Sequence, residues 1–267
     1  MFTDTHAHLS HKDFDADRGE VLARASSQGV FKIIEIACAP SEWAPGEALS
    51  LQAAGRLRCA FGIHPEYVKD IQPGAAEELE NYLQKPCAVA VGEIGLDYWW
   101  EPGRRAEQLA LLEAQLPLCA KYSKPAVFHA RSGREPGLDA YAELLSLLKQ
   151  KWTYSPGKRF RGVLHCFSGR WEDAKAGMDL GLSLGVNGTF TYKKNGDLRD
   201  IIMRAGADNI VLETDCPYLP PQSARGKRND PSFIPEIAAM TASHLGLGTN
   251  HLADKTTANA FALFGAF

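Results

Sequence analysis

The sequence predicts an α/β protein of the (β/α)8 type, a TIM barrel, in which residues 1–267 form a single domain. Short apolar runs alternate with longer amphipathic segments along the whole chain, and this alternation is typical of parallel βαβ units. There are eight such runs in 267 residues, which matches a barrel of roughly 250 residues. No internal repeat, low-complexity linker or break in composition divides the chain, so one domain is the simplest organisation.

The predicted strands are almost continuously apolar, as expected of parallel strands that helices cover on both faces. They occupy residues 1–5, 31–37, 58–63, 88–93, 126–129, 162–165, 182–186 and 210–214. Helical patterns fall between them at 17–28, around 45–54, and at 75–83, 104–122, 138–151, 172–180 and 198–205. Two further helices, near 235–245 and 253–264, close the chain. An open doubly wound sheet is the alternative, but no G-x-G-x-x-G motif follows the first strand to support it.

Composition and charge limit the classes of function. Hydrophobic residues make up 45% of the chain, which is ample for a buried core. The formal net charge of −3 excludes a broadly basic nucleic-acid binder, so a polyanion has to be met by local cations or by metal. No run of 18 apolar residues predicts a membrane span, and the N-terminus lacks the basic and apolar regions of a secretory signal. We therefore expect a cytoplasmic protein.

The six cysteines favour the same compartment. None forms a C-x-x-C pair, and most lie inside apolar runs, where a reduced thiol behaves as a small hydrophobic group. Cys166 and Cys216 flank candidate site residues. Packing explains both better than a nucleophilic role does.

The first strand ends in a histidine pair, His6 and His8. Side chains at i and i+2 of an extended strand point to the same face, so both imidazoles are directed to one point, as a metal ion requires. Taken alone, the pair is equally compatible with a surface turn.

Similar residues end other predicted strands, and the carboxyl ends of all strands of a barrel share one face. Singly, each could be an exposed histidine, an ion-pair partner or a turn residue, but together they predict one metal site. Four imidazoles and two carboxylates exceed the ligands of one tetrahedral ion and indicate two divalent cations. The predicted ligands are His6, His8, Glu93, His129, His165 and Asp215.

Other polar residues are candidates for substrate binding. His64 ends the third strand and is expected to contact substrate rather than metal, with a structural role before Pro65 as the alternative. Arg131 follows His129 by two residues and is expected to face the same mouth. The loop 223–231 after the last strand contains Arg225, Lys227 and a further arginine, which suit phosphate oxygens, although such a loop is often merely solvated.

At these residues the chain resembles a known family over essentially its whole length. The motifs are DTHAH at 4–8, GIHP at 62–65, GEIGLDY at 92–98, PAVFHAR at 125–131, HCFSG at 165–169, ETDCP at 213–217 and RGKRN at 225–229. In this order they are similar to those of the TatD-type metal-dependent deoxyribonucleases, which belong to the amidohydrolase-like barrels.

The resemblance implies one to three divalent ions and hydrolysis of phosphodiesters, often as a 3′–5′ exonuclease on single-stranded DNA. It implies that His6, His8 and Asp215 bind one metal, that His129 and His165 bind another, and that Glu93 bridges them. We expect two ions, with Mg, Mn and Zn all compatible with the ligands. The expected partner is single-stranded DNA, with no membrane and no obligate protein partner.

Two departures from the family pattern bear on substrate preference. A basic residue or histidine is usual soon after the motif ending at Tyr98, whereas this chain has Trp99, Trp100 and Glu101. The tryptophans are equally compatible with stacking on an unpaired base and with packing at the barrel rim. The usual Asn-Glu-Pro after the Gly-Lys motif is Asn-Asp-Pro at residues 229–231.

The expected catalytic residues are Asp215 and Glu93. Asp215 would both bind metal and take the proton from the attacking water, while Arg131, Arg225 and Lys227 would stabilise charge on the phosphate. Glu213 shares a strand face with Asp215 and is expected to orient a histidine or form an ion pair.

Two other functions compete with this one. The same ions could hydrolyse an amide or ester, for example in deacylation of aminoacyl-tRNA. Many such barrels carry a carboxylated lysine on the fourth strand, where this chain has no lysine. The third alternative is a non-catalytic module that binds nucleic acid or metal.

Overall fold

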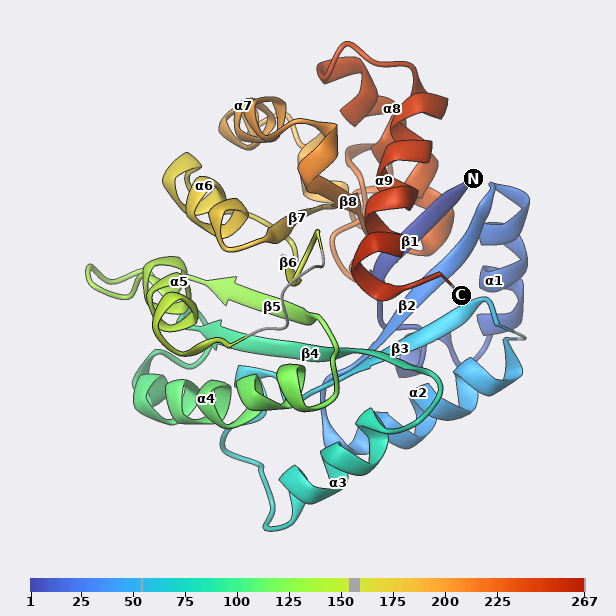
Figure 1. Cartoon of the computed structure of the whole chain (residues 1–267). Helices are drawn as coiled ribbons and strands as arrows, with labels where there is room; N and C mark the ends of the chain where they lie inside the picture. Colours follow the sequence, from blue (N-terminus) through green and yellow to red (C-terminus); the bar gives the residue numbers. More distant parts are fainter. Residues whose placement is uncertain (54, 154–158, 267) are drawn as a thin grey trace.

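The computed structural model describes residues 1–53, 55–153 and 159–266. Its strands form one sheet in which each strand pairs in parallel with the next, in the order β1 to β8. Helices surround the strands, as Figure 1 shows, and the predicted TIM barrel is confirmed. The strands are β1 Phe2–Ala7, β2 Val30–Ala37, β3 Leu57–Phe61, β4 Ala88–Asp97, β5 Ala126–Arg131, β6 Gly162–Leu164, β7 Leu182–Val186 and β8 Ile210–Leu212.

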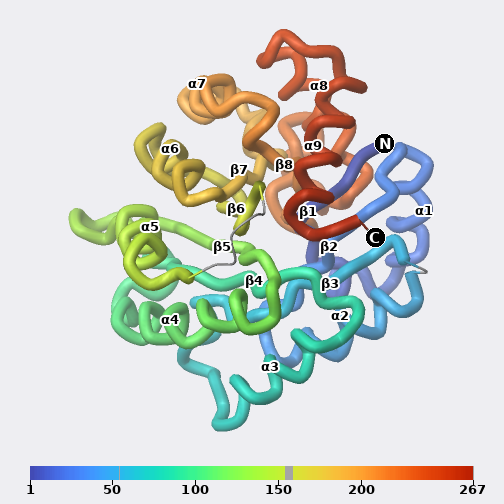
Figure 2. The backbone as a smooth tube through the Cα atoms, in the orientation of Figure 1, coloured from blue at the N-terminus to red at the C-terminus, as the bar shows by residue number. Residues whose placement is uncertain are grey.

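Contacts between the first strand and the segment after the last strand close the barrel. Ala7 forms an isolated parallel bridge with Cys216. The backbone amide of His8 donates to the carbonyl of Cys216 at 2.8 Å, and the amide of Asp215 donates to the carbonyl of His6 at 2.8 Å. Figure 2 shows β1 and β8, the first and last strands of the sheet order, beside each other. Barrel closure therefore brings the histidine pair next to Asp215.

The main helices are α1 Arg18–Ser27, α2 Pro40–Gln52, α3 Ala75–Leu83, α4 Arg105–Lys121, α5 Ala140–Lys151, α6 Trp171–Asp179, α7 Gly196–Ala205, α8 Ile234–His244 and α9 Thr249–Phe264. Every predicted helix is present, but α2 begins five residues before the predicted 45, because Pro40 can occupy the first turn, where its missing N–H costs nothing. Residue 54, the predicted end of that helix, lies outside the described residues. Over the parts of the chain that the structure describes, no helix is long and apolar enough to cross a membrane.

The barrel interior is filled by strand residues of one parity. Val127, Val163 and Val211 belong to one buried cluster, whereas their neighbours Phe128, Leu164 and Leu212 pack outward beneath the helices. Phe160 precedes β6 and joins the inner cluster together with Leu263 of α9, so α9 covers the amino-terminal end of the barrel.

The same parity directs polar side chains to the open end. Residues two positions after the inward-facing valines are His129, His165 and Glu213, so they continue the inner face toward the carboxyl ends. The end of the barrel at the carboxyl ends of the strands therefore receives the side chains that the sequence patterns predicted.

β4 departs from this simple alternation. The sequence pattern ends the strand at Glu93, but β4 continues for four more residues to Asp97. Its pairing with β5 shifts register between Gly92 and Ile94, and Val91 and Ile94 both pack outward. One extra residue is thus inserted, and this bulge turns Glu93 toward the barrel axis.

Candidate metal centre

The histidine pair of β1 meets Glu93 and Asp215 at the mouth of the barrel. His6 is fully buried, and its Nε2 lies 3.3 Å from Nε2 of His8. The same His6 nitrogen is 3.3 Å from Oε2 of Glu93 and 3.7 Å from Oδ1 of Asp215. His8 Nε2 is 3.5 Å from the same Asp215 oxygen. Two imidazoles and two carboxylates therefore converge on one point.

The second oxygen of Glu93 faces a different set of imidazoles. Glu93 Oε1 lies 2.8 Å from Nδ1 of His129, 3.6 Å from Nε2 of His165 and 3.7 Å from Nε2 of His64. The carboxylate thus has one oxygen toward the histidine pair of the first strand and the other toward His129 of β5 and the histidines that follow β3 and β6. This is the geometry of a group that can be shared between two adjacent ions.

His129 is held between two carboxylates. Its Nδ1 faces Glu93, and its Nε2 is 2.9 Å from Oδ2 of Asp97, the last residue of β4. The other oxygen of Asp97 accepts hydrogen bonds from the backbone amides of Trp99 and Trp100, each at 2.9 Å. Asp97 therefore fixes both the histidine ring and the tryptophan turn.

His165 has its own supporting carboxylate. Its Nδ1 lies 3.0 Å from Oε1 of Glu213, and that oxygen also accepts the backbone amide of Cys166 at 2.6 Å. Its Nε2 lies 3.9 Å from Oδ1 of Asp215. Glu213 thus contacts a histidine, in line with the sequence expectation, and directs Nε2 of His165 into the mouth.

The proton on His64 can be assigned from its contacts. Its Nδ1 accepts a hydrogen bond from the backbone amide of Glu66 at 3.1 Å. A neutral imidazole that accepts at one nitrogen carries its proton on the other, so Nε2 is the donor that faces the mouth. This nitrogen lies close to the other donor atoms, yet its protonation suits a hydrogen-bond donor better than a metal ligand.

Burial and neighbouring charges together shift the pKa values of the groups in this cluster. Burial opposes protonation of His129, but hydrogen bonds to Asp97 and Glu93 outweigh it and raise its pKa to about 10. Burial and then the neighbouring His129 lower the pKa of His64 to about 3, so His64 is neutral. Glu93 is buried as well, but the surrounding histidines keep its pKa well below the usual range. The mouth therefore offers ionised carboxylates at neutral pH.

Among the described residues, three sets of donor atoms lie within 4.8 Å of one another. They are His6, His8 and Glu93; His6, His165 and Asp215; and His64, Glu93 and His129. The 3.3 Å between the nitrogens of the β1 pair is close to the roughly 3.4 Å that separates two nitrogen ligands of one tetrahedral zinc ion. Nitrogen and oxygen donors in this mixture fit Zn, Mn, Fe or Ni and, less well, Mg. The donor atom of His165 groups with His6 and Asp215 rather than with His129.

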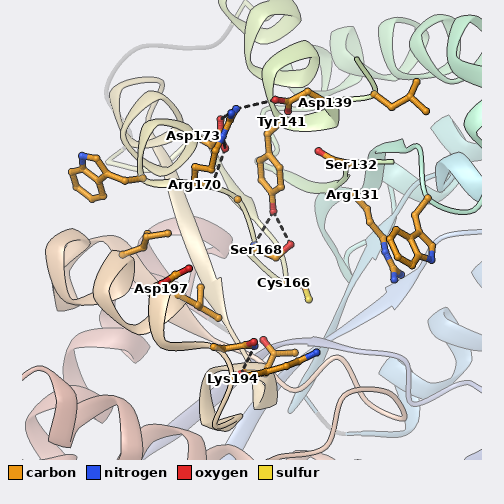
Figure 3. A pocket seen from close by; sticks show the side chains of 18 of the residues that line it. Arg131, Ser132, Asp139, Tyr141, Cys166, Ser168, Arg170, Asp173, Lys194 and Asp197 are labelled. Carbon is orange, nitrogen blue, oxygen red and sulfur yellow. Dashed lines mark hydrogen bonds and ion pairs between the residues drawn. The ribbon is translucent and has the colours of Figure 1, made fainter. Parts of the chain in front are cut away.

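Two cavities open at this end of the barrel. One, of about 660 Å³, has a lining that includes His8, Glu93, His129, His165, Asp215, Trp100 and Tyr218. The other, of about 1000 Å³, lies over the segments after β5, β6 and β7 and is lined by Trp99, Ser168 and Lys194 among others. Figure 3 shows Arg131 on one side of the larger cavity and Arg170 tied to two aspartates on the other.

Arg131 and the two tryptophans separate these cavities. Arg131 lines both of them, and its guanidinium lies 5.0 Å from the ring of Trp99 and 5.4 Å from the ring of Trp100. Trp99 also contacts Arg134 at 4.0 Å and is half-buried. Trp100 is 61% exposed and lines only the cavity of the metal centre. The two tryptophans therefore have different surroundings.

The basic loop after β8 lies apart from both cavities. Arg225 and Lys227 are exposed and line neither of them, and the Arg225 guanidinium lies 4.4 Å from the ring of Tyr192. Arg228, the third cation of the loop, forms a bidentate ion pair with Asp17 at 2.5 and 2.9 Å. Arg228 thus anchors the loop to the amino-terminal end of α1. The cation pattern suggests that it contacts phosphate, but in the structure it is already paired with a carboxylate.

Several supporting residues had no role assigned from sequence. Asp97 and Asp4 both lie within motifs, but only the folded chain reveals their partners. Asp4 is fully buried and accepts hydrogen bonds from the amide of Thr214 at 2.9 Å and from its hydroxyl at 2.6 Å. It joins β1 to the residue before Asp215.

Comparisons with known proteins identify the family of this chain. The family model described as TatD related DNase matches residues 3–265. The 3'-5' ssDNA/RNA exonuclease TatD of Klebsiella pneumoniae (strain 342) is 33% identical over 267 residues, which cover 98% of this chain and 97% of the relative. The metal-dependent hydrolase YabD of Bacillus subtilis (strain 168) is 29% identical, covering 99% of each chain.

Solved structures give the same answer. YJJV, a TatD homolog from Escherichia coli K12, superposes with a TM-score of 0.90 at 31% identity and covers 100% of this chain and 98% of its own. The fold, the cluster of donors and these relatives define a metal-dependent hydrolase. More specifically, the chain belongs to the TatD-related DNase family.

Proposed function

We propose that this protein hydrolyses phosphodiester bonds of nucleic acid, with single-stranded DNA as substrate and two divalent ions as cofactors. The position of Glu93 is the principal support. Its two oxygens face two different sets of imidazoles, at 3.3 Å and 2.8 Å from the nearest nitrogen of each. A shared carboxylate of this kind is typical of two-metal hydrolases. The names of the relatives favour a nucleic-acid substrate and 3′–5′ exonuclease polarity.

In this proposal His6, His8 and Asp215 would hold the first ion, His129 and His165 the second, and Glu93 both. His165 could serve the second ion as well as the first set of donors, because its Nε2 lies 3.6 Å from Oε1 of Glu93, the oxygen that also faces Nδ1 of His129. Bound divalent ions lower the pKa of water toward neutrality and neutralise phosphate charge. Asp97 keeps the proton of His129 on Nε2, which leaves Nδ1 as the ligand atom. Glu213 lies 3.0 Å from Nδ1 of His165, which would leave Nε2 as the ligand atom of this histidine.

Asp215 is the proposed proton acceptor. It is buried, and its pKa is lowered because the charges of His165, His6 and His8 outweigh the effect of burial. An ionised carboxylate at the mouth can accept a proton from an attacking water through the oxygen that no histidine occupies. The three histidine contacts recorded for Asp215 all involve Oδ1, so Oδ2 is the oxygen we assign to this step.

Substrate binding involves His64 and Arg131. The Nε2–H of His64 can donate to a phosphate oxygen, since its Nδ1 is already occupied by the amide of Glu66. Arg131 is exposed at the border of the two cavities and can pair with phosphate from there. Arg225 and Lys227 are exposed farther out, which supports a weaker role on phosphates beyond the scissile one.

We also propose that residues 1–267 act as a single domain in the cytoplasm. One eight-stranded sheet and one family match over residues 3–265 support the single domain. All six cysteines are free thiols, which favours a reducing compartment.

The deciding experiment is chelation followed by addition of Mg²⁺, Mn²⁺ or Zn²⁺, with single-stranded DNA, RNA, duplex DNA, an amide panel and aminoacyl-tRNA as substrates. We expect chelation to abolish cleavage of single-stranded DNA and one of the metals to restore it. Restored hydrolysis of only the amide or the aminoacyl-tRNA would contradict the proposal.

Variants then separate metal ligands from substrate contacts. Replacing His129, His165 or Asp215 by alanine should reduce both turnover and bound metal. The loss of turnover should exceed the roughly 10- to 100-fold that is typical when a residue hydrogen-bonded to a metal ligand is removed. Elemental analysis measures the bound metal. The exposed His251 serves as the matched control, and H251A should retain wild-type turnover and wild-type metal content. Replacing His64 by alanine should lower activity while metal content stays unchanged. Wild-type turnover in purified D215A would refute the assignment.

The outer loop gives a further prediction. Lys227→Ala should raise the Michaelis constant for an oligonucleotide and flatten its dependence on salt, since one counterion fewer is released on binding. Metal content should not change. A variant whose kinetics match the wild type at every salt concentration would remove Lys227 from the substrate path.

A further inference from the structure

Two exposed aromatic side chains flank the metal centre. Large hydrophobic side chains that are exposed among the described residues are few, and two of them, Trp100 and Tyr218, line the cavity of the metal centre. Trp100 is 61% exposed and Tyr218 is 51% exposed. Exposed aromatic surface of this size at a polar mouth calls for a ligand that covers it.

The two rings come from opposite sides of the barrel. Trp100 follows β4 and Tyr218 follows β8, and these strands are four positions apart in a closed order of eight. The ring of Tyr218 lies 6.0 Å from that of His8, on the β1 side of the centre. Trp100 lies near Arg131, on the β5 side. The metal-centre residues therefore stand between the two aromatic rings.

Both aromatic residues sit on turns that buried side chains fix. The amide of Trp100 donates to Asp97, whose other oxygen contacts His129. The carbonyl of Tyr218 accepts from the fully buried Asn229 at 2.6 Å, and its amide donates to the carbonyl of Asp215 at 2.9 Å. Because these turns are already ordered, the protein loses little conformational entropy when a ligand stacks on either ring.

Trp99, unlike Trp100, is not an exposed ring that lines the cavity of the metal centre. Two guanidinium groups lie against it, at 4.0 and 5.0 Å, and it is half-buried in the wall between the cavities. The tryptophan pair thus divides its tasks, with Trp99 supporting Arg131 and Trp100 facing the cavity.

We propose that Trp100 and Tyr218 are stacking platforms for the two unpaired bases on either side of the scissile phosphate. This inference rests on the proposed nuclease function and deepens it. Aromatic rings on both sides of a phosphate site suit a single strand, because every base has a face that can stack. In a duplex the bases on either side of a phosphate are paired and stacked inside the helix, so they cannot both stack on aromatic side chains. The two platforms therefore select single strands over duplex.

The test compares Michaelis constants of W100A, W100F, Y218A and Y218F on a short single-stranded oligodeoxyadenylate. Loss of one platform should raise the Michaelis constant about tenfold, with a smaller change in turnover, and the phenylalanine variants should retain most of the wild-type affinity. Phe31 provides the matched control, since it is an exposed aromatic that lines neither cavity, and F31A should behave as the wild type.

A second substrate distinguishes stacking from a structural effect. In an oligonucleotide whose bases next to the cleaved bond are replaced by abasic tetrahydrofuran residues, the penalty of W100A and Y218A should shrink severalfold, because nothing remains to stack. Equal penalties on both substrates, or wild-type constants in both alanine variants of an active nuclease, would overturn the inference. A wild-type protein that cleaves no nucleic acid would overturn the proposed function itself, and the platforms with it.

Discussion

At the scale of single residues, Asp97 links two parts of the site, the tryptophan turn and His129. One oxygen accepts the amides of the tryptophan turn, and the other contacts Nε2 of His129. Because an ionised carboxylate only accepts hydrogen bonds, Asp97 keeps a proton on Nε2 of His129, the nitrogen that faces it. In the proposed metal centre, Asp97 would therefore control the protonation of a ligand without binding the ion itself.

Asp97→Asn tests this control. The amide oxygen can still accept from the tryptophan turn, but its NH2 group then faces Nε2 of His129 and forces the proton onto Nδ1. We expect about a 10- to 100-fold loss of activity or metal affinity, with an unchanged circular dichroism spectrum. Wild-type metal affinity and turnover in this variant would show that the His129 tautomer is unimportant.

At the scale of elements, β4 differs most from its sequence prediction. Hydrophobic alternation places its end at Glu93 and, continued without a bulge, would turn that side chain outward, because Val91 faces outward. The inserted residue between Gly92 and Ile94 reverses this direction and extends the strand to Asp97. Register shifts depend on pairing with the neighbouring strand, so the sequence of β4 alone cannot reveal them.

Gly95 makes this extension of β4 possible. Its φ is +151°, and an added Cβ would lie 2.0 Å from the carbonyl oxygen of His129. Gly95→Ala should therefore lower the free energy of unfolding by about 3 kcal/mol, as overpacked sites do, measured by denaturant titration. Gly19 in α1 is the control, because an added Cβ there meets nothing within 4 Å, and Gly19→Ala should leave stability equal or slightly higher. Equal effects of the two substitutions would contradict the steric explanation.

At the scale of the whole molecule, the sequence predicts the barrel and the gathering of six polar residues at one end. Both follow from general rules, the alternation of strands with helices and the shared direction of parallel strands. The proton on His64, the different surroundings of Trp99 and Trp100, and the pairing of Arg228 with Asp17 depend on contacts between distant segments. No local sequence pattern encodes these contacts. For the same reason the sequence could not show that Arg225 and Lys227 line neither cavity.

Metal binding should stabilise the entire barrel, since ligands from β1, β4, β5, β6 and the end of β8 join at one site. A ligand present at 100 times its dissociation constant adds about 2.7 kcal/mol to the stability of the folded state. Adding Mn²⁺ or Zn²⁺ to chelated protein should therefore raise the melting temperature in thermal denaturation. D215A should show a much smaller rise, and an equal rise in both proteins would place the stabilising ion elsewhere.

The contact between Asp4 and Thr214 joins residues that are 210 positions apart. At a synthesis rate of about 5–20 residues per second, roughly 10–40 s separate the two positions during translation. Because the β1 histidines are made first and the neighbouring Asp215 nearly last, a ribosome-bound chain that stops before Asp215 lacks one side of the candidate metal centre. We therefore expect no hydrolase activity from this chain until nearly all of it has emerged from the ribosome.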